Sequence, residues 1–223
     1  MQSSSSCKLY ALNLRPCLQG GRWKLLLPAL TPARAARACA CRKEADAARI
    51  AGAGWLLDFA LTKENIPPAA RVFSKNEWGK PFLKDLPLAF SLSHAGHYAV
   101  CAVGPSPLGV DIESARCTMA LAGRHFHPDE LSYLQSLPSA SQPEALLRLW
   151  TAKEAFLKAL GRGLSLPLDC FSVSLSPSGA QLHQTLSHAP LLLHEYRLQA
   201  FHICLCAPQA RPALVELCAP NAP

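Results

Sequence analysis

A breaker cluster near the middle of the chain, Gly104-Pro105-Ser106-Pro107, limits the possible folds more than any other feature. Glycine and proline at this density end regular structure and open a linker. Both helices and strands are expected before this cluster, and both are expected again after it. The chain therefore predicts an α+β fold of two similar halves, residues 1–105 and 106–223, with a ligand site at their interface.

Local signals place the expected elements in each half. Thr31 is suited to cap a helix whose first residue is Pro32. Gly52 and Gly54 either weaken the next helix or allow close packing against it. We expect further helices over 46–61, from residue 128 and over 144–160, and strands over 88–93, 98–103, 108–113, 171–175 and 196–206.

Composition excludes several classes of protein. Half of the 223 residues are hydrophobic and 17% are charged, so the chain is not a disordered one. No apolar run approaches the roughly 20 residues of a membrane-spanning helix, and the serine-rich start has no features of a secretory signal. The ten scattered cysteines form no C-x-x-C pair, so we expect reduced thiols. These features indicate a soluble, cytoplasmic protein.

The charge is unevenly distributed between the two halves. Residues 1–105 contain 14 Lys and Arg against 6 Asp and Glu, whereas residues 106–223 contain 8 against 9. A positive field of this kind attracts a polyanion such as nucleic acid, a phosphorylated cofactor or an acidic protein. Charge alone does not choose among these three partners.

Two acids alternate with apolar residues in the segment Gly109-Val110-Asp111-Ile112-Glu113. The two-residue period of a strand puts Asp111 and Glu113 on one face, with Cβ atoms about 7 Å apart. Two like charges on a strand of the core repel each other, and a divalent cation would relieve that repulsion. The alternative is a strand whose polar face is in contact with solvent.

A third acid lies on a helix predicted over residues 144–160. Glu154 falls on the same helical face as Leu147, Trp150 and Leu157, and Lys158 follows one turn later. A simple surface ion pair between Glu154 and Lys158 is the alternative interpretation. Three acids from two elements would form an all-oxygen site that suits Mg²⁺. Mg²⁺ beside a basic half indicates chemistry on a phosphate or pyrophosphate.

Five segments together resemble a known family. They are Trp78-Gly79-Lys80-Pro81, Phe90-Ser91-Leu92-Ser93-His94, Gly109-Val110-Asp111-Ile112-Glu113, Trp150-Thr151-Ala152-Lys153-Glu154-Ala155-Phe156-Leu157-Lys158, and Gly161-Arg162-Gly163-Leu164-Ser165-Leu166-Pro167-Leu168 with Phe171-Ser172-Val173. In this order they are similar to the motifs of the 4′-phosphopantetheinyl transferases, in the Sfp-type, stand-alone monomeric class. The resemblance covers roughly residues 30–206.

The resemblance implies an activity and a set of catalytic residues. Members of the family move the phosphopantetheine arm of coenzyme A to a serine of a carrier protein and release adenosine 3′,5′-bisphosphate, in a fold that is a pseudo-dimer of two α+β halves. By motif position, the Mg²⁺ ligands would be Asp111, Glu113 and Glu154. Glu154 would also be the general base, directly or through a water, and Lys158 would contact the phosphates and steady the leaving group.

The same resemblance implies a nucleotide site and partners. Lys80, Ser93 and His94 would hold the nucleotide and its phosphates. Arg34, Arg37 and Arg49 would contact the 3′-phosphate and pyrophosphate. The partners implied are coenzyme A and acidic apo acyl or peptidyl carrier proteins, without nucleic acid or membrane, and the protein would be a monomer.

Other positions leave questions open. Ser91 replaces an asparagine that is usual in this class, which puts one hydrogen bond in doubt. Glu130 matches a recurrent acid of the class, and we interpret it as a helix-start residue. A Mg²⁺-dependent nuclease or phosphohydrolase would use the same acids and basic surface. A nucleic-acid-binding protein is disfavoured, because residues 8–49 contain few aromatic side chains for base stacking.

Overall fold

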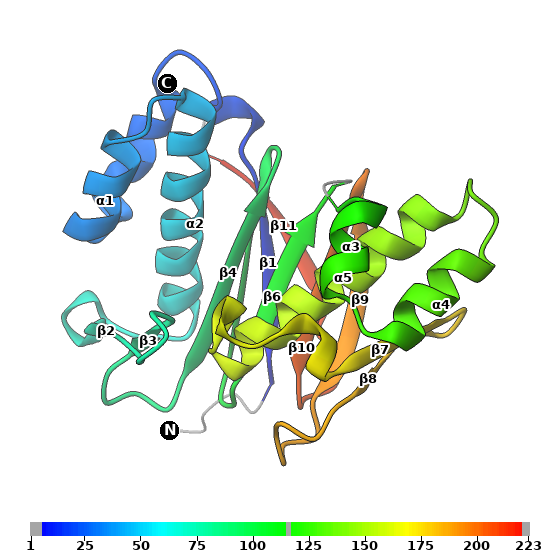
Figure 1. Ribbon diagram of the computed structural model, residues 1–223. Helices are drawn as coiled ribbons and strands as arrows, with labels where there is room; N and C mark the ends of the chain where they lie inside the picture. The colour runs from blue at the N-terminus through cyan, green and yellow to red at the C-terminus, as the bar shows by residue number, and fades with distance from the viewer. Residues whose placement is uncertain (1–5, 115–116, 220–223) are drawn as a thin grey trace.

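The computed structural model describes residues 6–114 and 117–219, which form two larger sheets with helices outside each (Figure 1) and two two-stranded hairpins. The first sheet has the strand order β11-β1-β5-β4. Its elements are β1 (Lys8–Asn13), β4 (Ala89–Ala95), β5 (Tyr98–Gly104) and β11 (Leu214–Cys218), with α1 (Pro32–Cys39), α2 (Glu44–Lys63) and the hairpin of β2 (Phe73–Lys75) and β3 (Pro81–Leu83) beside it. Short 3₁₀ segments, Arg15–Cys17, Arg22–Ala29 and Pro68–Ala70, connect these elements.

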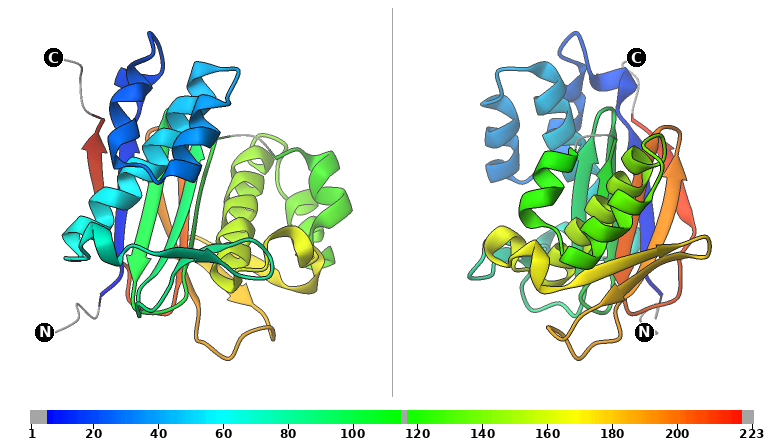
Figure 2. Two further views of the ribbon diagram at one scale, coloured as in Figure 1. Left: turned by 90° about the vertical axis from the view of Figure 1, so that its left-hand side faces the viewer. Right: turned by 45° about the vertical axis from the view of Figure 1, so that its right-hand side comes forward.

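The second sheet has the order β6-β10-β9. Its elements are β6 (Gly109–Glu113), β9 (Leu192–Leu198) and β10 (Phe201–Ala207), with α3 (Met119–His125), α4 (Pro128–Ser136), α5 (Gln142–Leu160), and the hairpin of β7 (Ser172–Ser176) and β8 (Gly179–His183). Figure 2 shows α3, α4 and α5 on the side of the molecule away from α1 and α2. Two 3₁₀ segments, Gly163–Ser165 and Leu168–Cys170, join α5 to β7.

Strand alternation sorts the apolar residues into three layers of core. In β1, Tyr10 and Leu12 pack toward α2, whereas Leu9 and Ala11 join a cluster between the two sheets. That middle cluster also contains Val110 and Ile112 of β6. The far face of the second sheet packs against α5. The layers therefore run helices, sheet, sheet, helices.

Most predicted elements lie where the sequence placed them, including the helix capped by Thr31, whose side chain accepts a hydrogen bond from the amide of Arg34. The prediction of a single strand over 196–206 is wrong, because this segment contains parts of two antiparallel strands, β9 and β10. The turn between them holds Gln199 at φ +55°. Turns of this kind usually contain glycine or asparagine, so the sequence carried no sign of it.

The last strand joins the first half of the chain. β11 pairs in parallel with β1, with Leu214 opposite Leu9 and Cys218 opposite Asn13. The proposed division into residues 1–105 and 106–223 did not anticipate this return. The mixed α+β class is confirmed, and the relation of the halves as a pseudo-dimer stays a prediction. No helix in the described part of the chain is long and apolar enough to cross a membrane.

A cluster of charged and polar side chains also connects α5 with β9 and β10 in the second half. Arg148 of α5 donates two hydrogen bonds of 2.7 Å to the carboxylate of Glu195, and the ring of His202 lies 3.0 Å from the same carboxylate. Burial alone would raise the pKa of Glu195, but the bonds from Arg148 and His202 outweigh it and lower this pKa to about 2. The cluster therefore stabilises the charged form of Glu195.

The pKa of Glu195 predicts how stability depends on pH. It falls from 4.5 to about 2 on folding, so Glu195 contributes about 3 kcal/mol above pH 4.5, and this is lost as pH falls through about 2. We expect Glu195→Gln to lower the free energy of unfolding by about that amount at neutral pH and by much less near pH 3. Urea unfolding at both pH values measures this. A deficit that is the same at both would show that the charge of Glu195 is not its cause.

Candidate active site

A pocket of about 470 Å³ opens between elements of the two halves. Its walls come from α1, from the loop between β2 and β3, from β4 and from the end of α5. Six residues that the family motifs implied line this one pocket: Arg34, Arg37, Lys80, Ser93, His94 and Lys158. Residues separated by more than 120 positions in the chain therefore converge on one volume.

The strand β6 carries its acids as the alternation predicted. Val110 and Ile112 are buried between the sheets, and Asp111, which is 3% exposed, points the other way, toward α5. Its Oδ1 accepts a hydrogen bond of 2.7 Å from the hydroxyl of Ser93 on β4. Its Oδ2 is buried and has no hydrogen-bond partner among the described residues. Glu113 has the same strand parity and therefore lies on the same face as Asp111.

Lys158 joins the two halves at this point. Its ammonium group donates hydrogen bonds to Asp111 Oδ1 at 2.6 Å and to Ser93 Oγ at 2.9 Å. The sequence left open a simple ion pair between Lys158 and Glu154, whereas the ammonium of Lys158 forms its ion pair with Asp111. Lys158, Ser93 and Asp111 are thus all hydrogen-bonded to one another, and these bonds connect α5, β4 and β6.

Glu154 lies one helical turn before Lys158 and is half-buried. Burial raises the pKa of Glu154, the negative charge of Asp111 raises it further, and the positive charge of Lys158 opposes both. The two carboxylates are therefore close enough to repel each other. A carboxylate with a raised pKa is a stronger base than an exposed one.

Cations surround the other side of the pocket. Burial lowers the pKa of Arg34, and the nearby charge of Arg37 adds to this effect. His94 lines the pocket and is exposed to solvent at one side. Desolvation by the surrounding protein lowers the pKa of His94, and the positive charges of Arg49, Lys158 and Arg34 lower it further. A backbone hydrogen bond opposes this shift. These groups destabilise one another's positive charge, so an anion in the pocket would be bound favourably.

Close packing against a glycine holds Arg34 in place. A Cβ atom on Gly54 would lie 2.3 Å from Cδ of Arg34 and 2.9 Å from Leu30. Gly52 has the same relation to Leu14, at 2.3 Å. Of the two roles that the sequence left open for these glycines, the structure therefore supports close packing.

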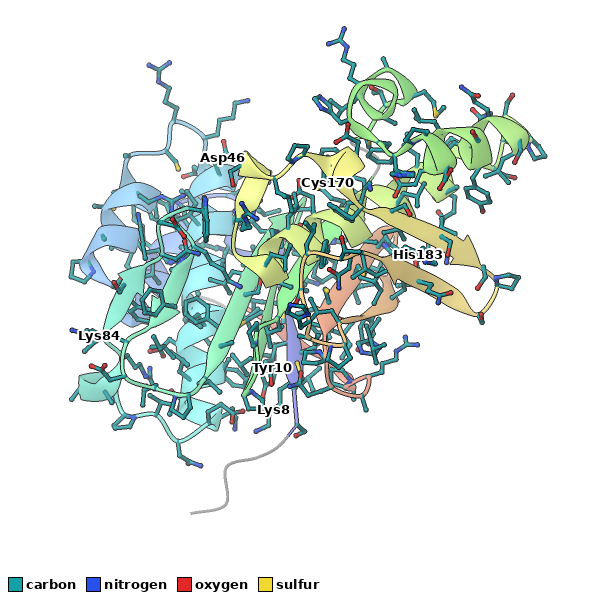
Figure 3. All side chains as sticks on the ribbon, turned by 60° about the horizontal axis from the view of Figure 1, so that its bottom comes forward. Lys8, Tyr10, Asp46, Lys84, Cys170 and His183 are labelled. Carbon is teal, nitrogen blue, oxygen red and sulfur yellow. The ribbon has the colours of Figure 1, made fainter. Side chains whose placement is uncertain are left out.

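Arg49 occupies a different position from the other predicted arginines. It does not line the pocket. Its guanidinium pairs with Asp46, which lies near the start of α2 and is labelled in Figure 3, and donates a 3.0 Å hydrogen bond to the carbonyl of Gly96. Its positive charge adds to burial in lowering the pKa of His94. Its predicted contact with phosphate stays a prediction.

Lys80 lines the pocket, but its ammonium is engaged by backbone. It donates to the carbonyl of Leu108 at 3.0 Å and to the carbonyl of Lys158. Burial, with a smaller contribution from the charge of Lys158, lowers the pKa of Lys80 to about 8. Two of its three donor positions are thus taken without a ligand.

The structure also assigns roles to two positions that the motifs left open. The hydroxyl of Ser91 accepts the amide hydrogen of Val110 at 3.0 Å, so it fastens β4 to β6 without the family's usual asparagine. Glu130 is buried and pairs with Lys153 at 2.7 Å, while its carboxylate caps the amides of His127 and Val173. Glu130 therefore starts α4, as expected, and anchors α5 at a distance from the pocket lining.

No group of three or more His, Cys, Asp or Glu side chains in residues 6–114 and 117–219 is arranged to hold a metal ion. The donor chemistry nevertheless suits a hard cation in part, because Asp111 Oδ2 is buried without a partner and Glu154 lies within its electrostatic reach. Mg²⁺ commonly uses one or two protein carboxylates and takes its other ligands from phosphate and water.

The sequence corresponds to a known class of enzymes. Residues 107–206 match the family model described as the 4′-phosphopantetheinyl transferase superfamily. A 4′-phosphopantetheinyl transferase of Bacillus subtilis is 33% identical over 205 residues, which are 90% of this chain and 92% of that protein. The chain therefore belongs to the 4′-phosphopantetheinyl transferases, and it is an enzyme of that class.

Other relatives agree with this assignment. The 4′-phosphopantetheinyl transferase Sfp of Bacillus subtilis strain 168 is 38% identical over 139 residues, 60% of this chain and 62% of that protein. The human L-aminoadipate-semialdehyde dehydrogenase-phosphopantetheinyl transferase is 30% identical over 211 residues, 81% of this chain and 68% of that protein. The resemblance to the Sfp-type class is confirmed.

Proposed function

We propose that this chain transfers the 4′-phosphopantetheine arm of coenzyme A to a serine of apo acyl or peptidyl carrier proteins, with Mg²⁺, and releases adenosine 3′,5′-bisphosphate. One observation carries the proposal: Ser93 and Lys158, which both donate hydrogen bonds to the buried carboxylate of Asp111, line a pocket that Arg34 and Arg37 also line. Cations lining a pocket, with an acid directly behind its lining, suit a ligand that carries phosphates and a bound metal.

The phosphates would bind along the cationic wall. Arg34 and Arg37 present guanidinium groups, whose planar donors match phosphate oxygens, and the cationic surroundings of His94 favour an anion there. Arg49 would help to fix the position of His94 through its hydrogen bond to the carbonyl of Gly96, two residues further along the chain. The net positive charge of the first half would also attract carrier proteins with acidic surfaces.

Asp111 and Glu154 would hold Mg²⁺, with Glu113 on the same strand face as a third candidate. When bound, the ion would neutralise negative charge on the pyrophosphate. In the protein without it, Lys158 supplies the positive charge nearest Asp111. Lys158 is therefore suited to balance charge on the acids and the pyrophosphate alike.

The reaction would be an in-line displacement at phosphorus. The serine hydroxyl of the carrier would attack the phosphorus bonded to the pantetheine oxygen and give up its proton to Glu154, directly or through a water. The new P–O bond would form as the bond to adenosine 3′,5′-bisphosphate breaks, and the negative charge would leave on that product. The raised pKa of Glu154 suits a proton acceptor.

An intact-mass assay tests the proposed function. The protein, coenzyme A, Mg²⁺ and a panel of apo carriers from fatty-acid, polyketide and peptide synthesis should yield a carrier heavier by one phosphopantetheine. A carrier whose acceptor serine is alanine should stay unmodified. Hydrolysis of coenzyme A without any carrier would favour a phosphohydrolase, and retention of DNA with a steep salt dependence would favour nucleic-acid binding.

Arg37→Ala tests the cationic wall. We expect the KM for coenzyme A to rise about tenfold, because one charge-assisted phosphate contact is lost, while kcat changes little. The rise should be smaller with 3′-dephospho-coenzyme A if Arg37 contacts the 3′-phosphate.

Arg42→Ala is the matched control, because Arg42 follows α1 closely, is exposed and lies outside the pocket lining. It should leave both KM values near those of the wild type. Equal losses in Arg37→Ala and Arg42→Ala would mean that overall charge, and not a pocket contact, binds the coenzyme. Arg49→Ala measured beside them tests the untested phosphate role of Arg49.

A further inference from the structure

The loop between β2 and β3 is fixed by one asparagine. Asn76 Oδ1 accepts hydrogen bonds from the amides of Trp78 at 3.1 Å and Lys80 at 2.8 Å, and the amide of Asn76 donates to the carbonyl of Lys80 at 3.0 Å. Asparagine closes turns in this way, with its side chain in place of backbone. Loop 76–80 is therefore a compact unit with a defined shape.

This loop contacts the C-terminal end of α5 in the other half. Asn76 Nδ2 donates a 2.7 Å hydrogen bond to the carbonyl of Gly161, and Lys80 donates to the carbonyl of Lys158. Figure 2 shows the β2–β3 hairpin extending from the first half toward this end of the helix. Gly161 has φ +71°, and a Cβ atom at this position would lie 3.0 Å from Cδ of Lys80 and 3.1 Å from Nδ2 of Asn76. The loop and the helix end fit together closely.

The contact adds hydrogen-bond donors at the carbonyl end of α5. The last carbonyls of an α-helix have no intrahelical donor, and a cation near them is stabilised by the helix dipole. Here the side-chain amide of Asn76 supplies the donor to the carbonyl of Gly161, and the ammonium of Lys80 is a second donor to the carbonyl of Lys158, which also accepts the amide of Gly161 at 3.2 Å. Because the same ammonium also binds the carbonyl of Leu108, which directly precedes β6, the loop ties α5 to the strand that carries Asp111.

We propose that Asn76 and Lys80 are positioning residues that fix the end of α5 against β6 and so hold Lys158 in reach of Asp111 and Ser93. The inference rests on the proposed function and deepens it. It assigns Lys80 a role through the backbone of α5 in place of the phosphate contact that the motif implied. Asn76 belongs to none of the motifs.

Asn76→Ser separates positioning from binding. Serine retains a short acceptor for the turn but does not reach the carbonyl of Gly161. We expect kcat for transfer to fall about tenfold, because small displacements of catalytic groups are costly, while the Kd of coenzyme A, measured by calorimetry without carrier, changes less than about twofold. Hydrogen exchange of the backbone amides in residues 157–163 should become faster.

Two further variants keep the test decisive. Glu77→Gln changes an exposed residue of the same loop, and it should match the wild type in all three measurements. If Asn76→Ser does not fold, Asn76→Asp retains the oxygen that accepts both turn hydrogen bonds, loses the donor to Gly161, and should show the same fall in kcat.

The outcomes are distinct. A wild type that modifies carriers, with an Asn76 variant of unchanged kcat, overturns the positioning role and leaves the proposed function standing. A variant with weaker coenzyme A binding at unchanged kcat overturns it too, and makes the loop a binding element. A wild type that modifies no carrier in the full panel contradicts the proposed function itself.

Discussion

Glu154→Gln should abolish transfer while the protein stays folded. Glutamine has nearly the same size and cannot accept the serine proton, so we expect kcat/KM to fall about a thousandfold, as for the loss of a general base. The melting temperature should stay the same or rise, because burial and the charge of Asp111 already disfavour the ionised form of Glu154. A coupled assay of carrier modification and a thermal melt measure the two effects.

The control for this variant is Glu144→Gln, which neutralises an exposed acid in the first turn of the same helix. It removes the surface pair with Arg197, and exposed pairs contribute little, so turnover and stability should both stay close to wild type. Near-normal turnover in Glu154→Gln would remove Glu154 from the roles of base and metal ligand.

Gly109→Ala should have the largest effect on the fold. Gly109 packs directly on the backbone of α5, and a Cβ atom there would lie 2.1 Å from the carbonyl oxygen of Ala155 and 2.3 Å from the amide nitrogen of Ala159. Backbone atoms cannot rotate away as a side chain does, so β6 and α5 would have to separate. We expect a loss of about 3 kcal/mol in the free energy of unfolding.

Activity should fall in the same variant, because the separation displaces Asp111 from Lys158 and Glu154. Gly123→Ala provides the contrast: Gly123 lies within α3, and a Cβ atom there would meet nothing within 4 Å. Alanine at that position should raise stability by about 0.5–1 kcal/mol. If chemical denaturation gives Gly109→Ala and Gly123→Ala the same free energy of unfolding, the close approach of β6 to α5 is not a constraint on the fold.

Features that depend on local periodicity were predictable from the sequence. The alternation in residues 109–113 predicted that Val110 and Ile112 are buried on one face and Asp111 lies on the other. The cap at Thr31 followed from the preference of helix starts for threonine before proline. Six residues that the family resemblance implied, four of them on the quoted motifs, line one pocket, although their functional roles stay predictions.

Features that depend on distant partners were not predictable. The sequence places Glu154 four residues before Lys158, but nothing local indicates that Lys158 instead pairs with Asp111, 47 positions away. The bond from Asn76 to Gly161 spans 85 positions, and no motif contains Asn76. Arginine is a residue type that suits phosphate, yet Arg49 donates a hydrogen bond to the carbonyl of Gly96 in the β4–β5 turn, 47 positions away. Its pair with Asp46, by contrast, is a local contact within α2.

In the proposed reaction, one adenosine 3′,5′-bisphosphate is released for each carrier serine that is modified at the pocket formed by α1, the β2–β3 loop, β4 and the end of α5. Its most direct test is the ratio of adenosine 3′,5′-bisphosphate formed to serine modified, measured by chromatography and peptide mapping of one reaction with coenzyme A, Mg²⁺ and an apo carrier. We predict equal amounts of both products at every time point and neither product without carrier. Nucleotide release that exceeds serine modification, or that continues without carrier, would contradict the account.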